Sequence, residues 1–352
     1  MRGLQIVHFS SSPSSHPYIL NPRIPVPPIT SSQLLIKIAV AGYCHTETMV
    51  ARGEFARMAL HDPLPQIPGH EPTGWVAAVG SEVGGEWEVG MRVGCLNYRN
   101  PCGACEECKA GRVLYCPNMQ MAGVTADGAM AEYMVADPLT TVRLPPSLTF
   151  ESAAPLFCAG ATIYASLLKA SLSPGQAVAI VGVGALGHLG VQFAKVMGLR
   201  VVAVDSRSAP LELVQTLRHP PDITLNSSTT PVSAALAQLP FQVDASIIAT
   251  DALPAYDYAL NLTRRHGTVV VVGQPGEPIP VQYGMLVFRD LTLRGSVLSS
   301  PEVCREMIKV FTEHELEVRT KVYALEEVDA LIEDTHREGM AGKMVVRVAE
   351  VF

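Results

Sequence analysis

The sequence predicts an α/β protein in which the central part forms a parallel sheet and the flanking parts are richer in β-structure. A short apolar run, Val178–Val181, is typical of a buried parallel strand. A glycine-rich turn and a helical apolar pattern reaching Met197 follow it, and a second apolar run ends at Asp205. Strand, turn, helix and strand in this order predict a βαβ unit.

The turn has the spacing G-x-G-x-x-G, formed by Gly182, Val183, Gly184, Ala185, Leu186 and Gly187. The first glycine permits a sharp turn, the second lets the backbone approach a pyrophosphate, and the third lets helix and strand pack closely. The helix N-terminus that follows offers free N–H groups to phosphates. Asp205 can accept hydrogen bonds from an adenosine ribose. We therefore expect dinucleotide binding, against the alternative of a glycine-rich turn in an ordinary α/β protein.

Composition limits the other possibilities. The 352 residues suffice for two domains, and 48% hydrophobic against 17% charged residues predicts a globular chain. The net charge of −7, with no basic block, argues against nucleic acid or an anionic membrane as partner. We expect no membrane span, because no apolar run approaches about 18 residues, and no signal peptide, because the N-terminal apolar stretch is too short.

The eight cysteines are expected to be thiols of a cytoplasmic protein that bind metal or take part in catalysis. Four of them, Cys102, Cys105, Cys108 and Cys116, lie in one short segment. Disulfides within C-x-x-C spacing are strained, whereas four thiolates fit one tetrahedral zinc ion. We expect a structural zinc here, with a redox dithiol and an iron–sulfur cluster as alternatives.

The remaining elements are predicted from short apolar patterns along the chain. Strands are expected at Leu4–Phe9, Leu34–Val40, Gly74–Gly80, Ala245–Ala249, Thr268–Val272 and Leu291–Leu298, with a closing strand from Lys343. Helices are expected from Glu151 to Lys169, at Leu253–Leu262 and at Pro301–Glu313.

Five segments together resemble one family: Gly42–Glu47, Gly69–Glu71, the four-cysteine segment, Cys158–Thr162 and the glycine turn with Asp205. They resemble the zinc-dependent medium-chain alcohol dehydrogenases, nearest to the yeast-type and cinnamyl-type branches, over nearly the whole chain. The resemblance implies an α/β plus β fold. A GroES-like catalytic domain would comprise residues 1–152 and 288–352, with a Rossmann dinucleotide-binding domain, residues 153–287, inserted in it. A homodimer or homotetramer is also implied, with edge strands paired near Leu291–Leu298.

The resemblance further implies a catalytic zinc bound by Cys44, His70 and Cys158, with Glu71 close behind the metal. Two sulfurs and one imidazole suit zinc and leave a fourth position open for a substrate oxygen. Two zinc ions per chain are therefore expected. Taken singly, each of these cysteines has the alternative of being a small buried apolar residue, which is what we expect of Cys95 and Cys304.

Roles for other residues follow from the same resemblance. Thr46 would hydrogen-bond the alcohol oxygen, and Glu47 would orient a metal-binding imidazole. The cofactor contacts would come from His45, Thr162, Arg207, Gly273 and Lys343, in addition to the glycine turn and Asp205. Lys343 stands where relatives often carry a phosphate-binding arginine, and lysine supplies charge without a bidentate fork. Asp205 predicts NAD rather than NADP, and the nearby Arg207 softens that preference.

The predicted reaction is hydride transfer between NAD(H) and a primary or secondary alcohol or aldehyde, with zinc as Lewis acid. The segment Leu96–Tyr98 lacks a tryptophan common in relatives, and Phe55–Pro68 is expected to line the same pocket, which favours substrates larger than ethanol. Met49 replaces a relay histidine of many relatives, and His61 is a weak candidate to replace it. A polyol dehydrogenase and a non-catalytic zinc- and NAD-binding redox sensor are the alternatives.

Overall fold

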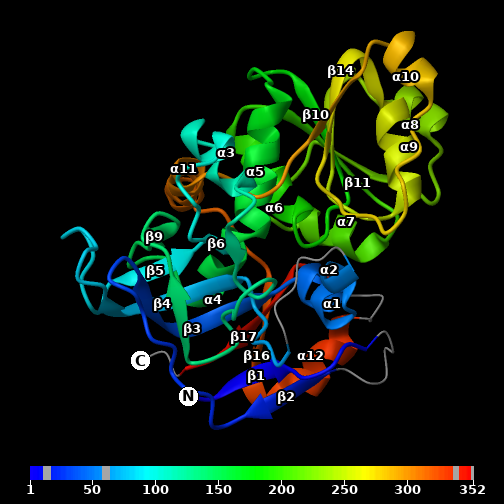
Figure 1. The fold of residues 1–352 in the computed structure, drawn as a ribbon. Helices are drawn as coiled ribbons and strands as arrows, with labels where there is room; N and C mark the ends of the chain where they lie inside the picture. Colours follow the sequence, from blue (N-terminus) through cyan, green and yellow to red (C-terminus); the bar gives the residue numbers. More distant parts are fainter. Residues whose placement is uncertain (11–16, 58–63, 336–340, 350–352) are drawn as a thin grey trace.

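The computed structural model describes residues 1–10, 17–57, 64–335 and 341–349, which form two halves, each built on its own sheet (Figure 1). The first half holds a seven-stranded sheet with the order β16(Thr320–Ala324)–β17(Lys343–Arg347)–β3(Leu34–Tyr43)–β4(Glu71–Val79)–β5(Arg92–Cys95)–β9(Thr141–Arg143), and β8(Tyr133–Ala136) also pairs with β3. The second holds six parallel strands in the order β12(Ile223–Asn226)–β11(Arg200–Asp205)–β10(Ala177–Val181)–β13(Val243–Ile248)–β14(Thr263–Val271)–β15(Thr292–Gly295).

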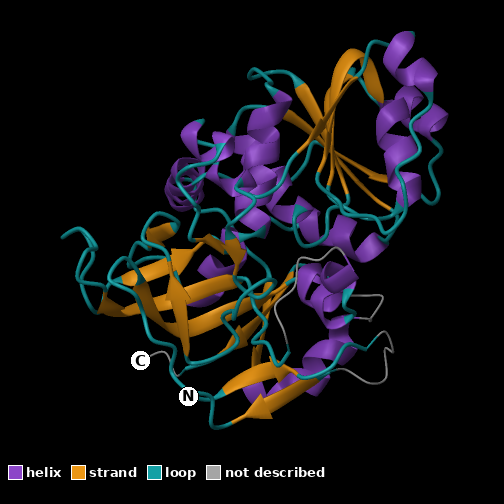
Figure 2. Cartoon of the chain, viewed as in Figure 1, coloured by secondary structure: helices purple, strands orange, loops and turns teal. Residues whose placement is uncertain are grey.

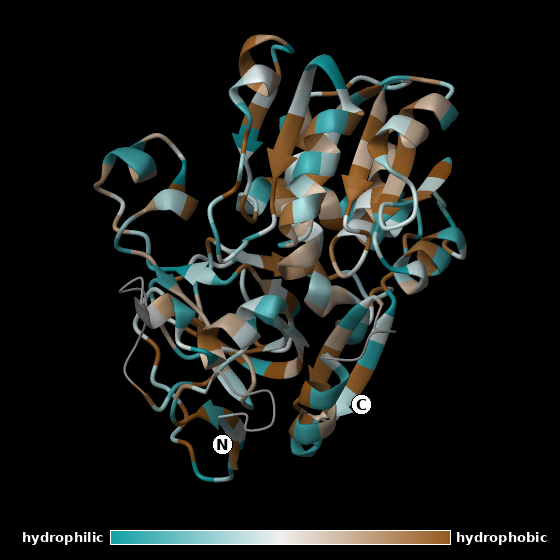
Figure 3. Cartoon of the chain, turned by 90° about the vertical axis from the view of Figure 1, so that its right-hand side faces the viewer, coloured by the Kyte–Doolittle hydropathy of each residue, from teal (hydrophilic) through white to brown (hydrophobic). Residues whose placement is uncertain are grey.

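Helices cover both faces of the six-stranded sheet (Figures 1 and 2). One face packs on α5(Ala159–Ala170), α6(Gly187–Val196) and α7(Ser208–Gln215), and the other on α8(Val232–Gln238) and α9(Leu253–Leu262). Val178 and Ile180 of β10 belong to the first core, while Ala179 and Val181 belong to the second. Burial on both faces explains the continuous apolar run of this strand, and several strands of this sheet are largely hydrophobic in Figure 3.

The remaining elements complete the described part of the chain. They are β1(Gly3–Ile6), β2(Tyr18–Asn21), α1(His45–Ala51), α2(Glu54–Arg57), β6(Tyr98–Arg99), α3(Glu106–Lys109), η1(Val113–Tyr115), β7(Gln120–Met121), α4(Phe150–Ala153), η2(Ala154–Phe157), α10(Tyr283–Val287), α11(Pro301–Glu313), η3(Leu325–Glu327) and α12(Val328–Thr335). No single described helix is long and apolar enough to span a membrane. The bent pair Phe150–Phe157 and Ala159–Ala170 passes on length and composition only, as buried core helices also do.

Two sequence-based expectations need correction. The boundary expected at residue 287 falls before the last strand of the six-stranded sheet, because β15 pairs in parallel with β14 through Gly295. The continuous helix expected from Glu151 is broken into α4, η2 and α5. Pro155 lacks an N–H and so cannot donate the next α-helical hydrogen bond after α4. Cys158, with φ −129° and ψ −70°, then becomes the N-cap of α5.

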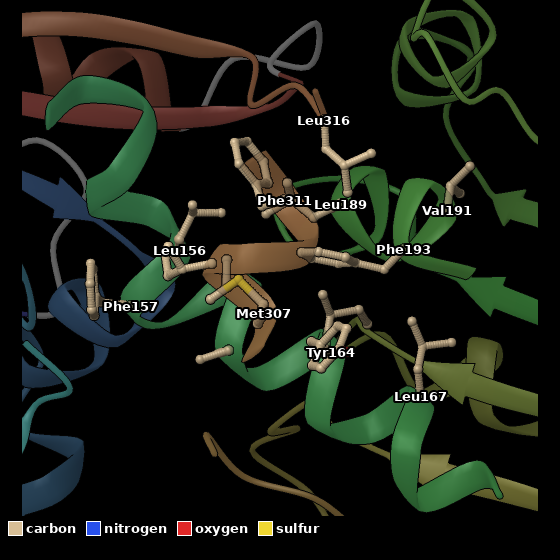
Figure 4. Close-up of a cluster of buried hydrophobic side chains, with 14 of the residues drawn as sticks. Leu156, Phe157, Tyr164, Leu167, Leu189, Val191, Phe193, Met307, Phe311 and Leu316 are labelled. Carbon is tan, nitrogen blue, oxygen red and sulfur yellow. The ribbon is translucent and has the colours of Figure 1, made fainter. Parts of the chain in front are cut away.

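The two halves are joined by an apolar cluster around α11 (Figure 4). Phe193 of α6 lies between Tyr164 of α5, at a centroid distance of 5.1 Å, and Phe311 of α11, at 6.5 Å. Glu317 lies just beyond α11 and is bonded to Gln192 of α6. The Gln192 side chain donates to the Glu317 carbonyl at 2.8 Å and accepts from the Glu317 N–H at 3.0 Å. The chain returning to β16 is therefore fastened to α6.

Candidate active site and metal centres

Residues that are distant in sequence meet at one end of the inner strands β3, β4 and β17. In the antiparallel register, Gly42 of β3 lies opposite Glu71 of β4, and Tyr43 lies opposite Met344 of β17. The residue after β3 is Cys44, and the residue before β4 is His70. Strand pairing therefore brings Cys44, His70, Glu71 and Lys343 to the same place.

Glu47 holds two of these groups in position. It lies in the first turn of α1, and its Oε2 accepts the Cys44 backbone N–H at 2.8 Å. Its Oε1 lies 2.5 Å from His70 Nδ1. Burial disfavours the charged imidazole, but the adjoining Glu47 carboxylate prevails and raises the pKa of His70 well above its usual range. A carboxylate accepts, so Nδ1 carries a proton, and Nε2 is the ring atom that can bind a metal once it has lost its own proton.

Cys158, at the start of α5, completes the cluster. The ligand atoms of Cys44, His70, Glu71 and Cys158 all lie within 4.8 Å of one another. His70 Nε2 is buried and has no partner among the described residues. A hydrogen bond with Cys158 lowers the pKa of Cys44 well below its usual range, and the same bond raises that of Cys158. Two sulfurs, one bare imidazole nitrogen and a nearby carboxylate fit a zinc ion.

Glu71 and Lys343 form a fully buried ion pair behind this cluster. Lys343 Nζ lies 2.6 Å from Glu71 Oε1, with side-chain exposures of 1% and 0%, and it also donates to the Tyr43 carbonyl at 3.1 Å. Burial raises the pKa of Glu71 to about 7, although the Lys343 charge opposes the shift. From the sequence, Lys343 is expected to contact a cofactor phosphate. The structure gives it Glu71 as partner, because β17 inserts beside β3.

The four-cysteine segment forms a second cluster. The sulfurs of Cys102, Cys105, Cys108 and Cys116 lie within 4.8 Å of one another. All eight cysteines, each within the described ranges, are free thiols. The Cys105 N–H lies 3.4 Å from the Cys102 sulfur, and the N–H groups of Ala104 and Cys105 lower the pKa of Cys102 to about 6. Backbone donors aimed at sulfur stabilise thiolates, so this donor set also fits zinc.

The glycine turn follows β10 as expected. Gly182 has φ +90°, which favours glycine, and a Cβ atom at position 187 would lie 2.1 Å from the Gly182 carbonyl oxygen. Asp205, at the end of β11, accepts the N–H groups of Val183 and Arg207, both at 3.0 Å. Strand order reverses between β10 and β13, and such a switch point is where parallel sheets bind ligands. The residues present fit a dinucleotide.

Comparisons with known proteins identify the family. The family model described as "Alcohol dehydrogenase GroES-like domain" matches residues 30–146, and the one described as "Zinc-binding dehydrogenase" matches residues 185–313. An alcohol dehydrogenase of Geobacillus stearothermophilus is 34% identical, covering 92% of this chain and 94% of the relative. The chain belongs to the zinc-dependent medium-chain alcohol dehydrogenases.

Further relatives agree with this assignment. Alcohol dehydrogenase 2 of Caenorhabditis elegans is 31% identical, over 94% of this chain and 92% of the relative. The alcohol dehydrogenase structure from Aeropyrum pernix has a TM-score of 0.88 at 26% identity, covering 99% of this chain and 100% of that one. A cinnamyl alcohol dehydrogenase from Sorghum bicolor has a TM-score of 0.87 at 26% identity, covering 100% and 98%. The fold class expected from the sequence, a Rossmann domain combined with a GroES-like domain, is confirmed.

The other expected site residues of the dehydrogenase lie in separate elements. His45 is exposed and its Nε2 lies 3.6 Å from Asp251 Oδ2. Thr46 is half-buried in α1, and Thr162 is buried in α5, four residues after Cys158. Gly273 follows β14, and its N–H donates to the Ile248 carbonyl at 3.0 Å. His61 lies outside the described residues.

Tyr98 and Asn97, two residues expected to line the substrate pocket, differ in their hydrogen bonding. Tyr98 is fully buried and donates to the Ser299 carbonyl at 3.0 Å, so its hydroxyl is occupied. Asn97 is buried, and its Oδ1 has no partner in the part of the chain that the structure describes. Asp251, which approaches His45 from the other half, is not among the residues expected from the sequence. Its position shortly after the predicted strand Ala245–Ala249, at the ligand-binding edge of the sheet, is the signal that could have found it.

Proposed function

We propose that the protein is an NAD-dependent zinc alcohol dehydrogenase or aldehyde reductase with two zinc ions per chain. The observation that carries the proposal is the Cys44–His70–Cys158 cluster, with a bare, buried imidazole nitrogen. Zinc bound there would supply Lewis-acid polarisation of an alcohol or carbonyl oxygen. The second ion would be held by Cys102, Cys105, Cys108 and Cys116 and would stabilise their loop.

The residues of the chain have separate tasks in this reaction. Glu47 fixes the tautomer and orientation of His70. Thr46, two residues after Cys44 on α1, holds the substrate oxygen and takes up the alcohol proton. Met49 is buried and carries no proton, so it cannot accept one from Thr46. The glycine turn and Asp205 would hold the dinucleotide, and Thr162 would contact its nicotinamide.

The catalytic assignment is tested with purified protein of known zinc content, NADH and a panel of aldehydes. We expect oxidation of NADH, with higher kcat/KM for aldehydes larger than acetaldehyde. Two zinc ions per chain without NADH oxidation would favour a non-catalytic redox sensor. Preferential oxidation of sugar alcohols would favour a polyol dehydrogenase.

Cofactor choice is expected to depend on Asp205. Its carboxylate is set for the ribose hydroxyls and repels a 2′-phosphate, and like charges placed together cost several kcal/mol. We expect kcat/KM with NADH to exceed that with NADPH by about tenfold or more, because Arg207 offsets part of the repulsion. Asp205→Ser should lower the ratio of kcat/KM with NADH to kcat/KM with NADPH. Equal kcat/KM for the two cofactors in the wild type would contradict the assignment.

Assembly into a homodimer or homotetramer in the cytoplasm completes the proposal. The edge strand β15 is exposed along its length, with Leu293 at 39%. Close to it in sequence, Tyr283, Val287 and Phe288 are exposed at 73%, 66% and 68%. An exposed strand edge with apolar side chains close by favours pairing with another chain.

A further inference from the structure

His188 is a buried histidine that the proposed reaction does not use. It is the second residue of α6, directly after the third glycine of the turn, and it is 0% exposed. Its Nδ1 lies 2.9 Å from the Gly184 carbonyl oxygen, and its backbone N–H donates to the same oxygen at 3.1 Å. A carbonyl oxygen only accepts, so Nδ1 carries the proton.

The other ring nitrogen of His188, Nε2, is buried and makes no hydrogen bond within the described ranges. Burial is the main cause that lowers the pKa of His188 to about 4, and the charges of Lys343 and Arg319 add to it, so the ring is neutral. An unsatisfied buried acceptor is unfavourable, and an apolar side chain of similar size would avoid it. What the imidazole adds is the bond from Nδ1 to Gly184.

The bond from His188 to the Gly184 carbonyl fixes the orientation of the peptide group between Gly184 and Ala185 in the glycine turn. The Gly184 carbonyl and the Ala185 N–H belong to one planar trans peptide and point in opposite directions. A carbonyl drawn toward the helix leaves the Ala185 N–H directed out of the helix N-terminus. In the part of the chain that is described, this N–H donates to no other group. Anions bind at such N-termini through free N–H groups.

We propose that His188 is a positioning residue for the dinucleotide, whose Nδ1–H fixes the Gly184 carbonyl and thereby aims the Ala185 N–H at the pyrophosphate. The inference rests on the proposed cofactor but not on the proposed substrate or metal. Gln192, one turn later, donates to the His188 carbonyl at 3.1 Å and to the Glu317 carbonyl. The turn is therefore held on a helix that is itself fixed to the other half.

Two variants separate the hydrogen bond from packing. Asparagine carries an N–H donor at the same position along the side chain as Nδ1, whereas leucine fills similar space without a donor. We expect His188→Leu to weaken binding of NADH and of ADP-ribose by about fivefold, the effect of one partly lost charge-assisted hydrogen bond. His188→Asn should stay within about twofold of wild type. Adenosine, which lacks phosphates, should bind all three proteins equally.

The measurements are Kd values from fluorescence or NMR titration, so they require no turnover. Unchanged ADP-ribose binding in His188→Leu, equal losses in the two variants, or an equal loss for adenosine would each overturn the positioning role. If His188→Leu does not fold, the ¹⁵N spectrum of the wild-type imidazole decides, because a protonated Nε2 and bare Nδ1 would also overturn it. Wild-type protein that binds no NADH would overturn the proposed cofactor. NADH binding without turnover would overturn the proposed activity alone.

Discussion

Replacing Cys158 by serine is expected to lower kcat/KM for aldehyde reduction by about 10³-fold or more while leaving a folded protein. A hydroxyl is a poor zinc ligand compared with thiolate. Losing a Lewis acid removes several kcal/mol of transition-state stabilisation, and each 1.36 kcal/mol is tenfold in rate. The site has an open position and lies between preformed elements, so the fold depends little on its metal. Steady-state kinetics, zinc analysis and circular dichroism would check this.

Cys105→Ser is the matched control at the other cluster. Its site is closed by four thiolates on a loop without a core of its own, so the metal there contributes to folding. We expect a lower melting temperature and reduced yield, with near-normal kcat in the protein that remains folded. A Cys158→Ser variant that kept both zinc ions and full activity would show that the catalytic cluster is misassigned.

Replacing Lys343 by methionine is expected to destabilise the protein by about 3–5 kcal/mol, because Glu71 would be left as a buried, unpaired carboxylate. The melting temperature should fall by roughly 5 °C or more at matched zinc content. The double variant Lys343→Met/Glu71→Gln should recover much of the loss, since no lone charge remains. Differential scanning calorimetry of the single and double variants would measure the coupling.

Lys309→Met supplies the control for this experiment. Lys309 pairs with Glu313 at 3.7 Å on the surface of α11, with side-chain exposures of 71% and 57%. Exposed pairs of this kind contribute about 0.5 kcal/mol or less. A Lys343→Met variant no less stable than Lys309→Met would contradict the structural role assigned to the buried pair.

Local patterns account for what the sequence could predict. The glycine turn, Asp205 and the four-cysteine loop are each contained in a short segment, so spacing alone indicates their chemistry. The ligand set Cys44, His70 and Cys158 was available only through the family resemblance, because strand pairing assembles it.

Several features of the structure were not predicted from the sequence, chiefly because they depend on contacts between distant segments. The Glu71–Lys343 ion pair depends on β17 lying beside β3, a register that no local pattern encodes. The break before Cys158 was overlooked because the small apolar residues around Pro155 continue a helical pattern. The strand expected at Leu291–Leu298 lies beyond the boundary expected at residue 287, because its pairing with β14 is a tertiary contact that no local pattern encodes.

The arrangement of β17 beside β3 has a consequence for synthesis on the ribosome. The six-stranded sheet uses one continuous stretch, from Ala177 to Gly295, and can form as soon as that stretch has emerged. The hydrogen bond from Lys343 to the Tyr43 carbonyl joins residues that are 300 positions apart. The strand ends that carry Cys44 and His70 therefore lack β17 as a neighbour until almost the whole chain has been made. Closing such distant contacts is slow. The nascent chain would therefore complete the glycine turn and its helix before it can close the surroundings of Cys44 and His70.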